Sequence, residues 1–452
     1  MTTEMTNERY RWYRELNGYH WFVLIVAALG WLFDCLDQQL FLLARQPAMK
    51  ELLPGTPVEA TIDEFGGYAT SIFLMGWGIG GLIFGVMGDR IGRAKTMMIT
   101  ILMYSIFTGL SALSTAFWDF AVYRFLTGMG VGGEFAVGVA LVAEVMPDRA
   151  RPYCLGVLQA LSAIGNVGAA LIGMTMGTLV ERGLVDSVGY WRYMFVIGAG
   201  PALLALVIRW RLREPARWEQ AAHEGTIARK LGSYRELFSH PVWRKHALLG
   251  LGLAFSGIVG LWGVGFYTFD LVANVLNKRF VAEGLSDKQV AGEVAHWKSI
   301  ASLMMNIGAA LGMYLFAVLA QRTGRKPAFA VCFIAALVST ASTFYFLNEF
   351  HQVFWMIPIM GFCILSLFAG YAIYFPELFP THLRSTGTSF CYNVGRFVAA
   401  LGPALLGWLT GVAYAETAEP LRNAGLTMCG IFLLGLFVLP FAPETKGKPL
   451  PE

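Results

Sequence analysis

Apolar runs of about 20 residues recur along the whole 452-residue chain, and they restrict its fold more than any other feature. A helix of that length crosses the hydrocarbon core of a bilayer, so each run is long enough for one membrane span. Only 14% of the residues are charged, compared with about 25% in soluble domains. The chain is therefore predicted to be an all-α membrane protein. Its net charge of +4 belongs to the loops and does not indicate nucleic-acid binding.

The hydropathy predicts twelve spans, and an even number places both termini on one side of the membrane. The predicted spans are 20–44, 65–88, 94–116, 118–144, 151–179, 188–210, 246–276, 297–319, 327–348, 352–376, 384–413 and 422–442. The longest polar connection, 211–245, follows the sixth span. We expect an N-terminal six-helix bundle over 1–210, a linker over 211–245 and a C-terminal six-helix bundle over 246–452.

Lysine and arginine predict the orientation of the chain. Most of the 34 basic residues fall in the tails and in the loops on the side that holds both termini. An excess of positive charge marks the cytoplasmic side. We therefore expect both termini to lie in the cytoplasm and the protein to lie in the plasma (inner) membrane. The first span shows no small-residue cleavage site, so no removable signal peptide is expected.

The chain contains an internal repeat. "GVMGDRIGRAK" (85–95) closes the second span and "AVLAQRTGRKP" (317–327) closes the eighth, while "AEVMPDRAR" (143–151) matches "PELFPTHLR" (376–384). Two six-helix halves repeated in the same orientation are an architecture of secondary transporters, which bind their substrate between the halves. The aligned pairs include Gly92 with Gly324, Arg93 with Arg325, Glu144 with Glu377 and Arg151 with Arg384.

Several short segments resemble motifs of the major facilitator superfamily. "GVMGDRIGR" is similar to its G-x-x-x-D-R-x-G-R loop motif, and "YRFLTGMGVGGE" to its R-x-x-x-G-x-G motif in span four. "REPARW" (213–218) and "PETKG" (443–447) are similar to boxes of its sugar porters. The resemblance extends over the whole chain. It implies twelve helices in two pseudo-symmetric six-helix bundles and transport by alternating access.

The likeness to particular branches leaves several substrate classes open. "FDCLD" (33–37) resembles the D-x-x-D of aromatic-acid and sialate proton symporters, which implies proton-coupled symport of a small organic acid or similar polar solute. A proton-coupled sugar porter is an alternative, because Gln159 and Asn166 follow Arg151 at the spacing of two sugar-porter amides. The paired glutamines that sugar porters carry in span seven are absent. A uniporter or non-transporting sensor, or an organic-cation carrier, would also fit the sequence.

The stretch "LGWLFDCLDQQLFLL" (29–43) places Asp34 and Asp37 inside an apolar span. Arg124 and Glu134 lie inside span four, and a rise of about 1.5 Å per residue puts Arg124 near the depth of Asp37. A charge at the bilayer centre costs about 2.5–3.5 kcal/mol, so these groups must face the protein interior. We predict that Asp34 and Asp37 couple transport to protons, with Arg124 as counter-ion, and that Glu134 continues the path inward. Alternatively, Asp37 and Arg124 form only a buried ion pair that fixes helix packing.

Arg396, near the midplane of span eleven, is the main candidate for binding substrate. Its planar guanidinium has five donors in a fork that matches a carboxylate. The alternative is a pair with a buried acid or with backbone carbonyls. Amide and aromatic side chains in the spans are further candidates to line the site, although each of them could equally serve helix packing: Gln159, Asn166, Asn393, Tyr392 and Trp262.

The resemblance also implies a charge network that closes the two halves on the cytoplasmic side. The residues expected in this gate are Asp89, Arg90, Arg93, Glu144, Arg151, Glu377 and Arg384. Ion pairs between moving elements can form in one state and break in another. The alternative is that the basic residues only set the topology.

Nothing in the sequence predicts an enzyme or a cofactor. The six cysteines lie in or beside apolar segments without a C-x-x-C pair, and the seven histidines show no metal-ligand spacing. No metal and no cofactor are therefore expected. The expected partners are a small-molecule substrate, protons and the lipid bilayer, with the chain acting as a monomer.

Overall fold

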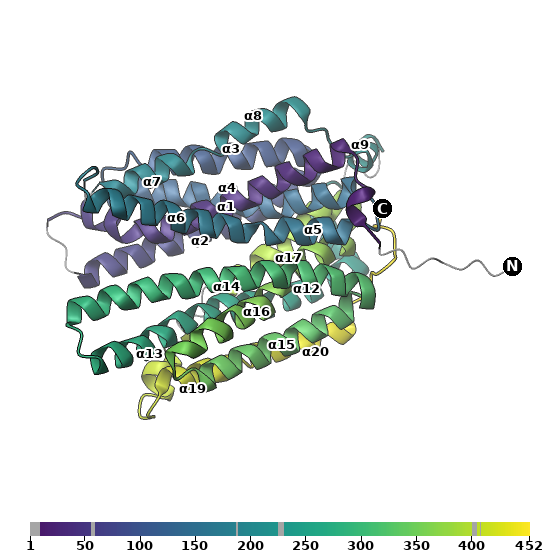
Figure 1. Cartoon of the computed structure of the whole chain (residues 1–452). Helices are drawn as coiled ribbons and strands as arrows, with labels where there is room; N and C mark the ends of the chain where they lie inside the picture. Colours follow the sequence, from purple (N-terminus) through teal and green to yellow (C-terminus); the bar gives the residue numbers. More distant parts are fainter. Residues whose placement is uncertain (1–9, 56–58, 187–188, 225–229, 400–404, 407) are drawn as a thin grey trace.

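The computed structural model describes residues 10–55, 59–186, 189–224, 230–399, 405–406 and 408–452, and this part of the chain is built from helices without a strand (Figure 1). Ten of the helical segments in the described residues are long and apolar enough to cross a membrane. Of the two remaining predicted spans, 188–210 corresponds to two successive helices, and 384–413 contains residues outside the described part of the chain. The predicted all-α membrane fold is therefore confirmed.

The first group of helices occupies the upper layer in Figure 1. It consists of α1 (Gly18–Leu52), α2 (Glu59–Arg90), α3 (Arg93–Ser111), α4 (Phe117–Val145), α5 (Arg151–Ala160), α6 (Ser162–Glu181), α7 (Tyr190–Gly198) and α8 (Ala202–Arg211). The predicted fifth span is α5 and α6, joined at Leu161. The predicted sixth span is α7 and α8, with Pro201 preceding α8. Proline lacks the backbone N–H that would continue α7, which accounts for the break.

The second group forms the lower layer in Figure 1. It consists of α12 (Pro241–Val259), the π-helix η2 (Gly260–Val264), η3 (Gly265–Tyr267), α13 (Thr268–Ala282), α14 (Asp287–Thr323), α15 (Arg325–Phe346), α16 (Phe350–Leu378), η4 (Thr381–Leu383), α17 (Arg384–Ala399), the π-helix η5 (Leu409–Ala413), α19 (Pro420–Met428), α20 (Ile431–Val438) and η6 (Leu439–Phe441). Residues 400–404 and 407 of the predicted eleventh span lie outside the described residues.

The first described residues, before α1, and the C-terminus lie at one end of the bundle, here called the termini end; the opposite end is called the far end (Figure 1). The short helices α9 (Ala216–His223) and α11 (Tyr234–Ser239) of the connecting segment lie at the termini end. The Trp218 indole donates to the Asp89 carbonyl over 2.7 Å, and Gly232 N–H donates to the His382 carbonyl over 2.9 Å. The segment thus contacts both groups of helices.

The repeat seen in the sequence has a backbone counterpart. Gly92 and Gly324 have positive φ angles of 114° and 112° and connect α2 to α3 and α14 to α15. Only glycine adopts this conformation without steric cost, so the two aligned glycines make the same turn in both halves. Each turn is followed by an acid-capped helix: Glu214 accepts from the N–H groups of Ala94 and Lys95, and Glu444 from those of Arg325 and Lys326.

Glycines also bring neighbouring helices into backbone contact. A Cβ at Gly128 or Gly132 of α4 would collide with the carbonyl of Phe73 or Trp77 on α2. The second group repeats this packing, since a Cβ at Gly308 of α14 would collide with the Pro358 carbonyl of α16. Small residues permit such close approach inside membranes, where apolar burial alone does not drive helices together.

Candidate functional site

A cavity of about 510 Å³ lies between the two groups of helices. One wall comes from α1, α2, α5 and α6, and the other from η2, α13, α14, α16 and α17. Its lining runs from Arg396, in the last turn of α17 and away from the termini end, to Arg45 near the end of α1 and Lys298 in the first third of α14. The cavity therefore extends from the middle of the bundle toward the far end.

Arg396 lies on the wall of this cavity with its guanidinium against two aromatic rings. The guanidinium carbon is 3.9 Å from the ring centre of Trp77 and 4.7 Å from that of Tyr392. Its Nε and Nη1 atoms are buried and have no hydrogen-bond partner among the described residues. The other buried arginines among the described residues each reach a carboxylate, namely Arg93, Arg124, Arg151, Arg325, Arg384 and Arg422. Arg396 thus has spare donors beside a cavity, which is an arrangement that can bind an anion.

Four more of the predicted substrate-binding residues line the same cavity: Gln159, Asn166, Tyr392 and Trp262. The Asn166 amide donates to Asn306 Oδ1 over 2.8 Å and so connects the two walls. Gln159 Oε1 is buried and has no partner among the described residues. Asn393 is not among the lining residues, because its amide donates to the Ser389 carbonyl over 3.2 Å and packs against Gly81.

Among the cavity residues that the sequence analysis did not select, Trp77 and Asn306 directly contact predicted ones. Trp77 provides the flat surface under Arg396, and Asn306 faces Asn166 across the cavity. A signal for Trp77 was present, because it is the one large side chain in the glycine-rich stretch "GWGIGG". A large residue among glycines on one helix has room to reach beyond its neighbours. Asn306 is a single amide within a long apolar run and carries no comparable signal.

Asp37 and Arg124 form an enclosed ion pair, with Arg124 Nη1 3.6 Å from Asp37 Oδ2. The Thr108 hydroxyl donates to Asp37 Oδ1 over 2.6 Å. Arg124 donates to the Ser111 hydroxyl from both Nε (3.0 Å) and Nη2 (2.7 Å), and its guanidinium lies 4.6 Å from the Phe195 ring centre. These partners come from α1, α3, α4 and α7. The predicted proximity of Asp37 and Arg124 is therefore present, in surroundings that hold both groups in place.

Asp34 and Glu134 have different surroundings. Both side chains are 1% exposed, and all four carboxyl oxygens lack a hydrogen-bond partner among the described residues. Glu134 on α4 reaches α1 at Gly30, where a Cβ would collide with its Oε1 atom. Neither carboxyl group lines the cavity, although Trp31 and Cys35, on either side of Asp34 in α1, do.

At the termini end, Glu144 connects the two groups of helices. Its Oε1 atom lies 2.9 Å from Arg93 Nη2 of α3 and 2.5 Å from Arg384 Nη1 of α17. Arg93 also donates to the Thr381 carbonyl over 2.6 Å and lies 3.0 Å from Asp89. These bonds join the first group to the second, so the predicted gate residues Asp89, Arg93, Glu144 and Arg384 form one network.

Asp89 caps a helix of the opposite group. Its carboxylate accepts from the N–H groups of Ser385 and Thr386, at 3.1 and 2.8 Å, and from the Thr386 hydroxyl at 2.6 Å. Free N–H groups and a positive partial charge at a helix N-terminus favour an acid there. The start of α17 is therefore held by a side chain of α2.

The remaining three predicted gate residues have partners that do not cross between the groups. Arg90 donates to the Leu231 carbonyl of the connecting segment, and Arg151 pairs with Asp148. Glu377 pairs with Arg325 at 2.7 Å and accepts from the Thr445 hydroxyl. The pseudo-symmetric equivalent of the Glu144–Arg384 bridge would be Glu377–Arg151, and it is not among the ion pairs of the described residues.

Glu444, which follows the last helix, caps the N-terminus of α15, and its hydrogen bonds keep its carboxyl group ionised. Burial raises the pKa of the Glu444 carboxyl, but N–H donors from Arg325, Lys446 and Lys326 outweigh burial and lower the net pKa below its ordinary value. The acid therefore stays ionised, as a cap at the N-terminus of α15 requires.

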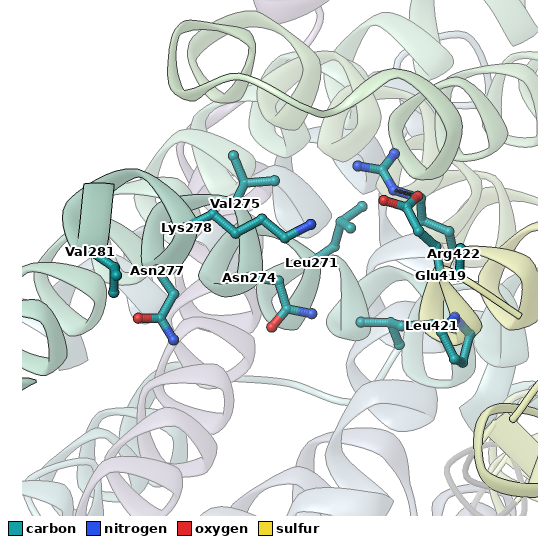
Figure 2. A pocket seen from close by; sticks show the side chains of 11 residues that line it. Leu271, Asn274, Val275, Asn277, Lys278, Val281, Glu419, Leu421 and Arg422 are labelled. Atoms are coloured by element: carbon teal, nitrogen blue, oxygen red, sulfur yellow. Dashed lines mark ion pairs between the residues drawn. The ribbon is translucent and has the colours of Figure 1, made fainter. Parts of the chain in front are cut away.

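A second cavity, of about 490 Å³, lies at the far end between α13 and the start of α19. Figure 2 shows Asn274 and Lys278 on one side and Glu419 and Arg422 on the other. Arg422 pairs with Glu419, and its remaining donors reach the carbonyls of Phe344, Tyr345 and Leu347. Arg422 therefore ties the loop after α15 in place, and none of the predicted site residues lines this cavity.

Within the described residues, no group of three or more His, Cys, Asp or Glu side chains is placed to hold a metal ion.

Comparison with known proteins identifies the family of the chain. The family model of the Major Facilitator Superfamily matches residues 27–287 and 280–452.

Two curated relatives extend over nearly the whole chain. A putative metabolite transport protein of Haemophilus influenzae is 28% identical over 96% of this chain and 99% of its own length. A probable 4-methylmuconolactone transporter of Cupriavidus pinatubonensis is 29% identical over 92% of this chain and 89% of its own length. Among solved structures, the proton:xylose symporter XylE bound to 6-bromo-6-deoxy-D-glucose matches with a TM-score of 0.74 and 19% identity, over 96% of this chain and 98% of that chain.

Proposed function

On the premise that the chain belongs to the Major Facilitator Superfamily, we propose that it is a proton-coupled symporter of a small organic acid that works by alternating access. Membership makes the chain an integral membrane transporter and not an enzyme. The choice of an acid as substrate rests on a single observation, which is the buried guanidinium of Arg396 with unused donors on the wall of the central cavity.

An anionic substrate group satisfies Arg396 better than a neutral one. A buried charge without a partner is costly, and a carboxylate would supply both the opposite charge and two acceptors for the fork of the guanidinium. Trp77 and Tyr392 already fix the plane of the guanidinium by stacking. Their rings leave the edge with Nε and Nη1 available, so little side-chain entropy is lost when an acid binds.

The charges around the cavity support an anion over a cation. Among the described residues, the lining contains Arg45, Lys298 and Arg396 but one carboxylate, Asp270. The buried acids of α1 and α4 do not line the cavity. A cation would therefore meet a net positive surface, which disfavours the organic-cation carrier.

We propose that the structure corresponds to a state closed on the cytoplasmic side. In this proposal both termini are cytoplasmic, the Glu144 network closes the inner side, and the cavity is reached from outside. The proton-coupling residues are drawn from Asp34, Asp37, Arg124 and Glu134. Since both walls of the cavity come from one chain, a monomer suffices for transport.

A proton-coupled sugar porter is the second candidate. Gln159 and Asn166 line the cavity, and amides of this kind can bind sugar hydroxyls. The unpaired guanidinium of Arg396 would then lack a partner, which is why the acid is preferred.

Counterflow in proteoliposomes tests the proposal. Vesicles that contain purified protein are loaded with an excess of unlabelled nicotinate, cis,cis-muconate, xylose or choline and diluted into the same compound carrying a radiolabel. We expect label to accumulate with one of the two acids and not with xylose or choline. Accumulation of xylose or choline alone would contradict an acid substrate. An imposed inward proton gradient should then drive net uptake of the acid, and gradient-independent uptake would indicate a uniporter.

A further inference from the structure

We infer that Asp34 and Glu134 form a carboxyl pair that holds the coupled proton, whereas Asp37 is a fixed partner of Arg124. The inference rests on the proposed symport. The inference gives the buried acids two different roles, proton binding by Asp34 and Glu134 and ion pairing by Asp37. The proton then lies on a pair that joins α1 to α4.

The two carboxyl groups meet at one place on α1. Side chains of a helix lean toward its N-terminus, so the Asp34 side chain lies over the turn that contains Gly30. The Glu134 carboxyl occupies the space beside Gly30 where a Cβ would otherwise be. The missing side chain at Gly30 lets the two acids approach.

No cation among the described residues pairs with either acid. Arg124 is engaged by Asp37, Thr108 and Ser111 and reaches neither Asp34 nor Glu134. Two ionised carboxylates side by side, without donors and out of water, would each pay the desolvation cost and would repel one another. Sharing a proton removes the repulsion, because a protonated carboxyl donates to its ionised neighbour.

The groups that face the pair are mostly neutral. Tyr104 of α3 is fully buried, packs against Gly130 one turn before Glu134 on α4, and has a hydroxyl without a partner among the described residues. Asp37 is the third acid nearby, and its charge is balanced by Arg124. Toward the cavity, Cys35 of α1, which follows Asp34, lines the wall together with Arg396. Arg396 also contacts Tyr392, which stacks on Phe135 next to Glu134.

Aromatic rings separate the pair from the cavity. Phe135, next to Glu134 in α4, lies 4.8 Å from the Trp31 ring and 3.8 Å from the Tyr392 ring, centre to centre. Trp31 and Tyr392 line the cavity, and Tyr392 also contacts Arg396. A substrate that moves Arg396 or Tyr392 must therefore move Phe135 and the helix segment that carries Glu134. This contact chain gives a physical link between substrate binding and proton access to the pair.

Infrared spectroscopy of the purified protein tests the inference without a substrate. A protonated carboxyl group has a carbonyl stretch that is resolved from amide bands and shifts in heavy water. We expect such a band at neutral pH in the wild type. Asp34→Asn and Glu134→Gln should each shift or weaken it, and the double variant should lose it. Glu377→Gln, which removes an acid that is paired with Arg325, should leave the band unchanged.

A wild-type spectrum without the band would overturn the inference, as would a band that survives in the double variant or disappears only in Asp37→Asn. If the double variant does not fold, the two single variants decide by the same criterion. These outcomes are independent of the substrate screen. A protein that transports none of the four compounds in counterflow can still show the band, and a transporter of nicotinate can lack it.

Discussion

Asp34 and Asp37, one turn apart on α1, should respond in opposite ways to the same substitution. Asp37→Asn leaves Arg124 buried without a counter-ion, which typically costs about 3–5 kcal/mol. Asp34→Asn removes one of two acids that repel each other, and the new amide can donate to the Glu134 carboxylate, so stability should stay the same or rise. Thermal unfolding of both variants in one detergent measures the difference. Equal losses of stability would show that Asp34 has a partner of similar strength.

Arg396→Lys tests the anion site at the same scale. Lysine keeps the charge but loses the planar fork and its stacking on Trp77. A hydrogen bond to a charged group contributes about 1.5–3 kcal/mol, so the acid identified by counterflow should bind about 10- to 150-fold more weakly. Arg192→Lys is a matched control, because Arg192 stacks on Trp191 but pairs with Glu51 outside the cavity. Equal affinities in wild type and Arg396→Lys would remove Arg396 from the site.

The sequence revealed the charged residues of the interior but not which ion-pair or hydrogen-bond partner each of them has. Charges stand out in apolar spans because membrane burial is costly, which is how Asp37, Arg124 and Arg396 could be selected. Whether a charge meets a partner depends on the rotation of each helix about its axis and on which helices meet. Those are tertiary properties, so the difference between Asp34 and Asp37 required the structure.

At the scale of elements, the contact between α2 and α4 yields a further prediction. Gly132→Ala places a methyl group against the backbone carbonyl of Trp77 on α2. The ring of the same Trp77 stacks on the Arg396 guanidinium in the cavity. Overpacking of this kind costs about 1–3 kcal/mol. Gly138→Ala, on the same helix, meets nothing within 4 Å and should be neutral or slightly stabilising. Thermal unfolding of the pair separates contact from helix propensity, and a similar loss in both would contradict the packing argument.

The elements themselves were largely predictable, because apolar length decides them. The breaks were not. Span six divides before Pro201, and span seven continues through the π-helix η2 into α13, so that one helical segment runs from Pro241 to Ala282. Hydropathy reports the apolar length of a segment but not the hydrogen-bond register inside it, and π-turns leave no hydropathy signal.

For the whole molecule, the repeat predicts symmetry and the structure departs from it at the termini end. Glu144 bridges to Arg384, whereas the aligned Glu377 and Arg151 pair with Arg325 and Asp148. Asp89 caps α17, but the aligned residue is Gln321, whose amide lies 3.5 Å from the Arg149 carbonyl. An uncharged amide cannot cap a helix as an ionised acid does. The bonds between the two groups at this end are therefore concentrated where α2, α3 and α4 meet η4 and α17.

This asymmetry predicts unequal effects of removing the two aligned residues. Asp89→Ala deletes the acceptors of the Ser385 and Thr386 N–H groups. Loss of an N-cap costs about 0.5–2 kcal/mol, so hydrogen exchange at the start of α17 should become about 2- to 30-fold faster. Gln321→Ala should change exchange at the start of α5 much less, because Gln321 accepts no N–H there. Exchange that accelerates equally at both helix starts would mean that both halves contribute to closure, and the inner gate would then be as symmetric as the repeat.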